Sequence, residues 1–223
     1  MQNDFLIDTK HFPLFIRFIT AELICGLQFL HRRGIVHRDI KPDNIMLDKD
    51  GHLRIIDLGL AQDRLTASTK IRGREGTTRY MAPEMILKKP YNVAVDWWSM
   101  GIVVSRMATG NSPFFDGQQL HIVRQSITTD KPSFPLWLDA DLKHLIKELL
   151  QKDPERRLGL TGDIRRHPFF GDMNWEELEQ RRIVPPFKPF PHVVGIDHLD
   201  LPEDAPALHP MSNFSFLAPS WTQ

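Results

Sequence analysis

Residues 37–44, HRDIKPDN, constrain the fold and chemistry of this chain more than any other stretch. They place two carboxylates, a lysine and an amide within one short polar segment. An apolar run precedes this segment and two β-prone runs follow it. Taken alone, so short a pattern also fits a polar turn between a helix and a strand. The segments that follow it along the chain decide between these interpretations.

The flanking sequence predicts regular elements on both sides of this loop. Residues 13–31 are apolar on nearly every face and end in basic residues followed by Gly34, which predicts a buried core helix. Residues 45–47 and 53–56 are β-prone and are joined by DKDG, which predicts a hairpin. A second apolar stretch, residues 93–108, predicts another buried helix.

Three motifs follow one another in the order found in protein kinases, and the chain resembles that family. HRDIKPDN resembles the catalytic loop H-R-D-x-x-x-x-N, Asp57-Leu-Gly resembles D-F-G, and Ala-Pro-Glu84 resembles the motif that closes an activation segment. The resemblance implies ATP and Mg²⁺ as cofactors. It implies that Asp39 accepts the proton of the substrate hydroxyl and that Asn44 and Asp57 hold the magnesium ion.

The same resemblance assigns supporting roles to other residues. Lys41 would stabilise the transferring phosphoryl group, and Thr77 would hydrogen-bond both Asp39 and Lys41, as in serine/threonine kinases. Asp96, in the DWWSMG stretch, would bond the backbone of the catalytic loop, because a carboxylate on a buried helix needs hydrogen-bond donors. Arg157 would pair with Glu84. These last contacts are expected to be structural rather than catalytic.

Later segments narrow the resemblance to AGC kinases, and most closely to protein kinase C. They are HPFF from His167, Asn174-Trp175, and RRIVPPFKP from Arg181. The expected fold is mainly α (α+β): a kinase C-terminal lobe with a small β-hairpin over residues 1–170, then an AGC tail over residues 171–223. A glycine-rich loop, an ATP-gripping lysine strand and its partner helix are not found in the 223 residues, so the N-terminal lobe is expected to be absent.

Two functions follow from this resemblance. The first is transfer of the ATP γ-phosphoryl group to serine or threonine hydroxyls of proteins, with little activity expected from this chain alone because half of the nucleotide contacts are missing. The second is a non-catalytic, kinase-derived binding or regulatory module. A kinase N-terminal lobe or a chaperone is an expected partner, because the lobe surface and the tail residues Phe214 and Phe216 would otherwise be uncovered.

Composition limits the other possibilities. Lysine plus arginine and aspartate plus glutamate both number 28, so no overall charge favours nucleic acid. The N-terminus does not resemble a secretory signal, and Arg17 and Glu22 interrupt the first apolar stretch, so no transmembrane segment is expected. The single cysteine, Cys25, suits a reducing compartment, and a cytoplasmic location is expected, with a nuclear or peripheral membrane location left open through regions outside this sequence.

Two departures from the family pattern predict differences in regulation and specificity. Gly73 stands where the resemblance places a phosphorylated threonine. Either Thr69 or Ser68 nearby takes the phosphate instead, or Glu75 offers Arg38 a weaker anionic partner. Arg106 stands where relatives carry a glutamate that selects basic substrates. Arg106 either lies in solvent with little effect or repels a substrate arginine.

Overall fold

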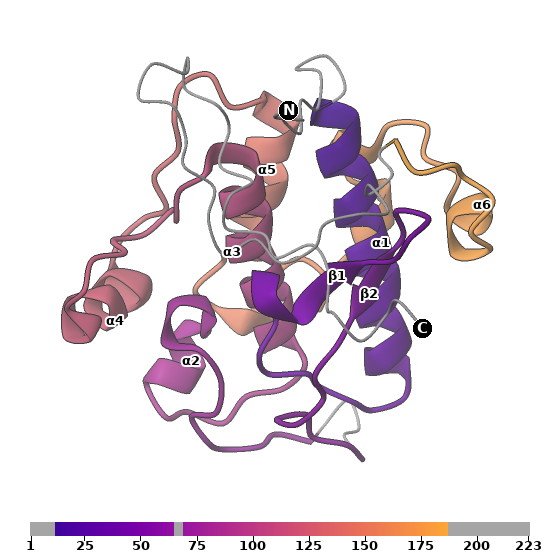
Figure 1. Ribbon diagram of the computed structural model, residues 1–223. Coiled ribbons are helices and arrows are strands. Elements are labelled where there is room, and N and C mark those ends of the chain that lie inside the picture. Colours follow the sequence, from indigo (N-terminus) through magenta and orange to yellow (C-terminus); the bar gives the residue numbers. More distant parts are fainter. Residues whose placement is uncertain (1–11, 65–68, 187–223) are drawn as a thin grey trace, which may run out of the picture.

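The computed structural model describes residues 12–64 and 69–186, which form a mainly helical fold with one small sheet (Figure 1). The expected mainly α (α+β) class is therefore confirmed in these residues. Its helices and strands are α1 (Phe12–Arg32), β1 (Ile45–Leu47), β2 (Leu53–Ile55), α2 (Pro83–Ile86), α3 (Ala94–Thr109), α4 (Leu120–Thr129), α5 (Ala140–Leu149) and α6 (Trp175–Glu179).

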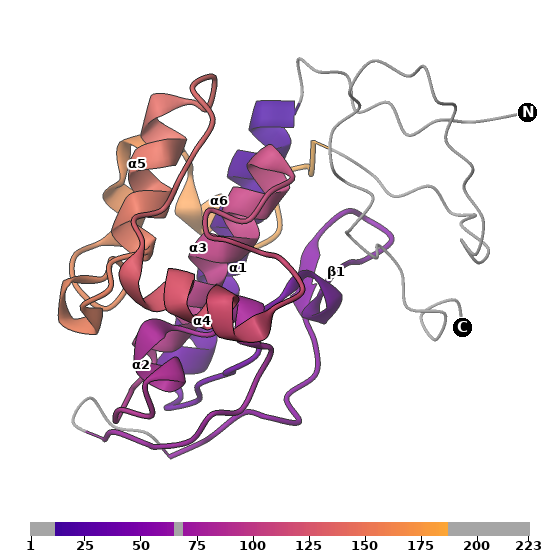
Figure 2. The same cartoon turned by 90° about the vertical axis from the view of Figure 1, so that its left-hand side faces the viewer.

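Helix α3 forms the centre of the core. Every residue in it except Arg106 is buried, and it packs against both α1 and α5 (Figures 1 and 2). Gly101 makes part of this packing possible, because an added Cβ would lie 2.9 Å from a methyl carbon of Leu150. Gly110 ends the helix in the left-handed conformation, with φ of 76°, which glycine adopts without steric cost.

Helix α1 spans the apolar stretch predicted to be a core helix. By length and composition alone, Pro13–Arg32 is apolar enough to cross a membrane, so Arg17 and Glu22 do not by themselves exclude a spanning helix. In this fold, however, 56% of that apolar stretch is buried against the rest of the protein. The helix contacts β2, α3 and α6 within this fold, as a core helix does.

The hairpin expected after the polar loop is present. Strands β1 and β2 are antiparallel, with Met46 opposite Arg54. Glu22 of α1 fastens the hairpin to the helix, since its carboxylate accepts a hydrogen bond of 2.6 Å from the Leu53 amide and lies 2.7 Å from His52 Nδ1. Burial raises the pKa of Glu22, and these two contacts oppose that rise.

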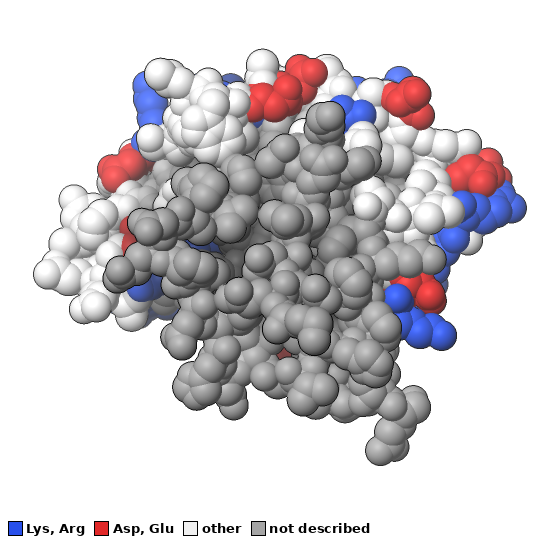
Figure 3. Space-filling view, turned by 45° about the horizontal axis from the view of Figure 1, so that its top comes forward, with Lys and Arg blue, Asp and Glu red and all other residues white. Residues whose placement is uncertain are grey.

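The remaining helices surround this core. Helix α4 lies at the edge of the fold and packs against α2 and the 3₁₀ turn Thr78–Tyr80, as the turned view also shows (Figure 2). Helix α6 lies in the segment predicted to be the tail and packs on α1. Phe214 and Phe216 fall outside the described residues. On the face shown in Figure 3, acidic and basic side chains lie side by side along the edges.

Candidate active site

A buried carboxylate holds the start of the 37–44 loop. Asp96 of α3 is fully buried and accepts hydrogen bonds of 2.9 Å from the backbone amides of both His37 and Arg38. His31 Nε2 lies 2.8 Å from the same carboxylate. Arg38 has a φ of 70°, an unfavourable conformation for a residue with a side chain. The expected role of Asp96 is thus confirmed, because its bonds stabilise a strained turn directly before Asp39.

Asp39, Lys41 and Thr77 form one closed cluster. The Asp39 carboxylate accepts a hydrogen bond of 2.8 Å from the Thr77 amide, and Lys41 Nζ lies 3.1 Å from its other oxygen. Lys41 also donates to the Thr77 hydroxyl at 3.2 Å. The hydrogen bonds expected from Thr77 are therefore present, and they join the 37–44 loop to the segment before α2.

These contacts decide the ionisation state of Asp39. Burial alone would raise its pKa, but hydrogen bonds from Thr77 and Lys41 outweigh that effect, so the pKa lies below its ordinary value. The group is consequently a carboxylate at neutral pH. Such a weakly basic oxygen is better suited to orienting a hydroxyl than to removing its proton early in a reaction.

The hairpin brings Asn44 and Asp57 to neighbouring positions on adjacent segments. The Asn44 carbonyl accepts a 3.0 Å hydrogen bond from the Ile56 amide, and Asp57 follows directly. The Asn44 amide nitrogen donates to the Asp39 carbonyl at 2.9 Å, which leaves its side-chain oxygen as the group suited to a cation. Asp57 is exposed and has a φ of 59°. One amide oxygen and one exposed carboxylate fit Mg²⁺, which takes few protein ligands beside phosphate and water.

Of the alternatives expected for Arg38, the structure shows the pair with Glu75. Its guanidinium lies 3.3 Å from the Glu75 carboxylate and donates a 2.6 Å hydrogen bond to the Leu60 carbonyl. Gly73 makes room for this arrangement, because an added Cβ at that position would lie 2.1 Å from Glu75 Oε2. The Glu75 carboxylate therefore occupies the space of a side chain at position 73.

A second arginine and glutamate pair lies in the core below this segment. Arg157 is completely buried and binds Glu84 of α2 through two hydrogen bonds of 2.7 and 3.1 Å. It also donates to the Ala94 and Gln151 carbonyls at 2.9 and 3.1 Å. The predicted pair is confirmed, and it satisfies a buried charge that would otherwise be costly.

Comparison with known proteins agrees with this geometry. The protein kinase domain family matches residues 5–170, which is most of the chain. The chain belongs to the protein kinase family. Protein kinase C delta type from Rattus norvegicus is 44% identical over 183 residues, covering 82% of this chain and 27% of the rat protein. Serine/threonine-protein kinase AtPK1/AtPK6 from Arabidopsis thaliana is 43% identical over 177 residues, covering 78% of this chain and 37% of the plant protein.

These relatives place the chain among AGC-type serine/threonine kinases, which include RAC-beta serine/threonine-protein kinase B from Xenopus laevis at 41% identity over 177 residues. That comparison covers 78% of this chain and 36% of the Xenopus protein. The chain therefore spans between about a quarter and two fifths of the curated kinases named here. Kinases of this family use ATP and Mg²⁺. The roles of Asp39, Lys41, Asn44, Asp57 and Thr77 in this chain remain predictions, although the structure brings them together.

Some residues that shape this kinase site were missed by sequence reasoning. Glu22 fixes the hairpin that carries Asn44 and Asp57 at its ends, although the sequence offered it only as an interruption of an apolar helix. Ser99 of α3 donates a 2.8 Å hydrogen bond to the Tyr80 carbonyl and so positions the turn that follows Thr77. A carboxylate in an otherwise buried helix was the available signal for Glu22, because it requires partners.

Proposed function

We propose that this chain is part of a serine/threonine protein kinase and contributes the residues that transfer the γ-phosphoryl group of ATP to protein hydroxyls. The observation that carries the proposal is the Asp39, Lys41 and Thr77 cluster. Its ionised carboxylate is held by two donors, the Thr77 amide at 2.8 Å and Lys41 Nζ at 3.1 Å, and Lys41 also donates to the Thr77 hydroxyl at 3.2 Å. Asp39 would bind and orient the substrate hydroxyl and accept its proton as the reaction proceeds. Lys41, next to it, would offset the charge of the phosphoryl group.

Asn44 and Asp57 would hold the magnesium ion in this proposal. Mg²⁺ would supply charge neutralisation at the nucleotide phosphates. The chain itself would position the two ligands. The Asn44 side-chain amide is fixed by its hydrogen bond to the Asp39 carbonyl, and Asp57 directly follows Ile56, whose amide is bonded to the Asn44 carbonyl. Asp39 and the magnesium ligands are thereby coupled through Asn44.

Partners and location follow as proposals from the same family membership. The substrates would be proteins with serine or threonine hydroxyls. An N-terminal kinase lobe, or a chaperone in its absence, would cover apolar side chains beside the site, since Leu58 is 52% and Leu60 38% exposed directly after Asp57. The balanced charge supports no role in nucleic-acid binding. We place the chain in the cytoplasm, with α1 as a core helix rather than a membrane span.

The test measures phosphoryl transfer and nucleotide binding separately. The chain, alone and fused behind the N-terminal lobe of rat protein kinase C delta, is incubated with labelled ATP, Mg²⁺ and serine peptides. Asp39→Asn is expected to lower the transfer rate about 10²–10⁴-fold with little change in nucleotide binding. Asp57→Asn is expected to weaken Mg²⁺-dependent nucleotide binding. Asp163→Asn, at an exposed turn, is the matched control and should change neither.

The two functions considered from the sequence predict different results. If the fusion transfers phosphate and the Asp39→Asn change abolishes this activity, the result supports the kinase function. A folded fusion that binds no nucleotide and transfers no phosphate contradicts the proposal and favours the non-catalytic module. Transfer that survives Asp39→Asn unchanged also contradicts it, because the cluster that carries the proposal would then be dispensable.

A further inference from the structure

A basic cluster lies two residues beyond Thr77. Arg79, in the 3₁₀ turn Thr78–Tyr80, pairs with Asp116 at 2.8 Å and donates a 3.1 Å hydrogen bond to the Gly117 carbonyl. Arg106, near the end of α3, binds the other oxygen of the same carboxylate. Two guanidinium groups thus share one aspartate, which leaves one positive charge of the cluster unbalanced.

The cluster retains hydrogen-bonding capacity. A guanidinium has five N–H donors, and the contacts above use only some of them. Arg106 Nε is buried and has no hydrogen-bond partner among the described residues, so an anion from solvent would bind the other N–H groups of the two arginines. The side chains of Arg79, Arg106 and Asp116 are 31%, 16% and 27% exposed, so an anion can approach the cluster from solvent while the arginines stay fixed. A fixed pair of guanidinium groups is suited to binding a carboxylate or phosphate.

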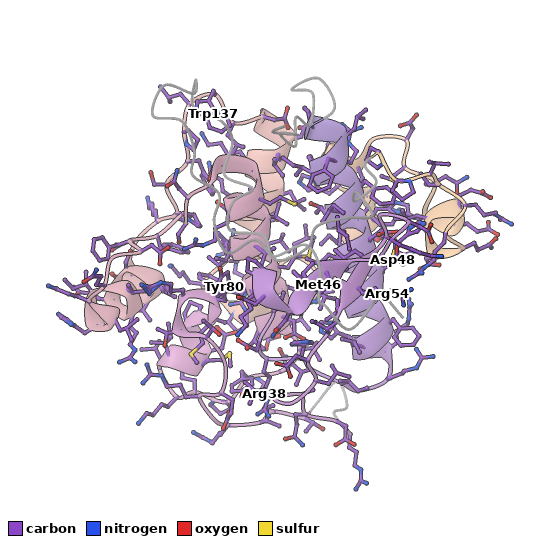
Figure 4. The ribbon with its side chains drawn as sticks, in the orientation of Figure 1. Arg38, Met46, Asp48, Arg54, Tyr80 and Trp137 are labelled. Carbon is purple, nitrogen blue, oxygen red and sulfur yellow. The ribbon has the colours of Figure 1, made fainter. Side chains whose placement is uncertain are left out.

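Tyr80 connects the cluster to the proposed catalytic carboxylate. Tyr80 is labelled in Figure 4. The Arg106 guanidinium lies over its ring, 5.7 Å from the ring centre. Burial raises the pKa of Tyr80; among the neighbouring charges, Arg106 and Arg79 oppose this rise, whereas Asp43 and Asp39 add to it. Tyr80 therefore has charges of both signs near it: two carboxylates of the 37–44 loop and the two arginines.

A peptide that binds with its hydroxyl at Asp39 would extend past nearby charged groups, and Tyr80 is close to charges on both sides. An extended peptide advances about 3.3–3.6 Å per residue. Residues within about three positions of the target hydroxyl consequently lie within reach of Tyr80 and its charged neighbours. Two fixed arginines beside this path favour an anionic side chain there and disfavour a cationic one.

A purely structural role for the arginines explains only part of the geometry. One guanidinium is sufficient to hold Asp116 and to fasten the 116–117 turn to the segment after Thr77. The second adds an excess charge and the unpartnered Nε of Arg106. Nor does Arg106 lie in solvent, which was one of the two expectations from the sequence, because its side chain is 84% covered and paired.

We propose that Arg79 and Arg106 form a specificity site that selects protein substrates with a carboxylate or phosphate side chain within about three residues of the target hydroxyl. This inference rests on the proposed kinase function. It reverses the preference for basic substrates that the family resemblance implies. Asp116 is a positioning residue in this site: it orders both arginines and offsets one of their charges.

The test uses binding, so that it does not depend on catalysis. Three fluorescein-labelled serine peptides differ only in the residues two positions before and after the serine, which are aspartate, alanine or arginine. Their binding to the full chain is followed by fluorescence anisotropy. The aspartate peptide is expected to bind about fivefold to tenfold more tightly than the alanine peptide, and the arginine peptide more weakly. This preference should shrink as salt is raised.

Two variants shift the charge of the site in opposite directions. Arg106→Gln should abolish most of the preference for aspartate, whereas Asp116→Asn should strengthen binding of that peptide about threefold, because it removes the competing carboxylate. Thermal unfolding checks that each variant is folded. If Asp116→Asn does not fold, Arg79→Gln provides a second test, because it should also abolish most of the preference for aspartate. Arg182→Gln, an exposed arginine paired with Glu177, is the matched control and should leave the preference unchanged.

The results separate this inference from the proposed function. Transfer or binding without a preference for aspartate overturns the specificity site alone, as does failure to bind any of the three peptides at millimolar concentration. A clear aspartate preference without phosphoryl transfer in the fusion supports the site and counts against the kinase proposal. Equal weakening by Arg106→Gln and Asp116→Asn overturns the inference, because it shows that the cluster is only a structural tie.

Discussion

Two arginine and glutamate pairs hold the segment between Asp57 and α2, and they differ mainly in burial. Arg157 and Glu84 are 0% and 4% exposed, and their closest atoms lie 2.7 Å apart. Arg38 and Glu75 are 11% and 43% exposed, and their closest atoms lie 3.3 Å apart. The same chemistry is thus used once in the core and once at the surface of the site.

The difference shows which pair is structural and which can vary. Arg157 has carbonyl acceptors besides Glu84, and its guanidinium lies 5.2 Å from the centre of the Trp98 ring, so every part of it is packed. Removing one member would leave a charge without compensation in the core. Glu75 faces water, which weakens its attraction to Arg38 and can replace it. The core pair therefore fixes the fold, and the surface pair biases the conformation of one segment.

The largest effect is expected for Glu84→Gln. This change keeps the shape of the side chain but leaves the buried Arg157 guanidinium without its counter-charge, and we expect a loss of about 3–5 kcal/mol in the free energy of unfolding. Urea unfolding measures it. The double variant Glu84→Gln/Arg157→Met should lose less than the single variant. If Glu84→Gln loses less than about 1 kcal/mol in the free energy of unfolding, the buried pair contributes no more than a surface pair, and the contrast with Arg38 and Glu75 fails.

Both pairs of this comparison were considered from the sequence, but on different grounds. The hairpin and the buried helices were predicted from polarity patterns, whereas the bonds from Asp96 and the Arg157–Glu84 pair were expected from motifs that resemble those of protein kinases. The Arg38–Glu75 pair was one of two alternatives, because Gly73 has no hydroxyl to phosphorylate; phosphorylation of Ser68 or Thr69 was the other.

Contacts outside such motifs were not predictable. Asp116 lies in a loop after α3, and nothing in the sequence shows that Arg79 and Arg106 meet at its carboxylate. Glu22 similarly binds the Leu53 amide, 31 residues away in the chain. These contacts depend on how the helices pack, which the polarity pattern of one segment does not determine. The charge of the proposed specificity site could therefore be read only in part from the sequence.

Gly73→Ala tests the surface pair from the glycine side. Gly73 has a φ of 146°, and a Cβ there would displace the Glu75 carboxylate. We expect Gly73→Ala to lower the free energy of local opening of residues 70–78 by about 1–3 kcal/mol, as measured by hydrogen exchange of their amides. Gly162→Ala is the matched control: its φ is 77°, but the nearest atom to its Cβ lies 3.6 Å away. Equal costs for the two variants would show that backbone strain, and not Glu75, explains the result.

Thr77→Val tests the cluster that lies between the two pairs. The variant removes the hydroxyl that contacts Lys41 and contributes to lowering the pKa of Asp39, and we expect a loss of about 1 kcal/mol at pH 7. Because the folded pKa is below the unfolded value of about 3.9, the stabilisation is present above that value. It disappears as the pH falls through the folded pKa. Unfolding measured at pH 7 and near pH 2.5 should show a shrinking difference from wild type, and a constant difference would refute the linkage to Asp39.

Glu75→Gln is expected to have the smallest effect and tests the contrast most directly. Removing the partially exposed charge should destabilise the segment by about 0.2–1 kcal/mol at low salt, because the pair gains little in water. Wild type and variant should converge as ionic strength rises toward 1 M, where charges about 3 Å apart and more are screened. The rate of proteolysis within residues 69–79 provides the measurement. Glu177→Gln, which removes the charge of the exposed Arg182–Glu177 pair, is the control. A loss that exceeds about 2 kcal/mol and resists salt would show that Arg38 needs Glu75 as Arg157 needs Glu84, and the distinction between a structural and an adjustable pair would fail.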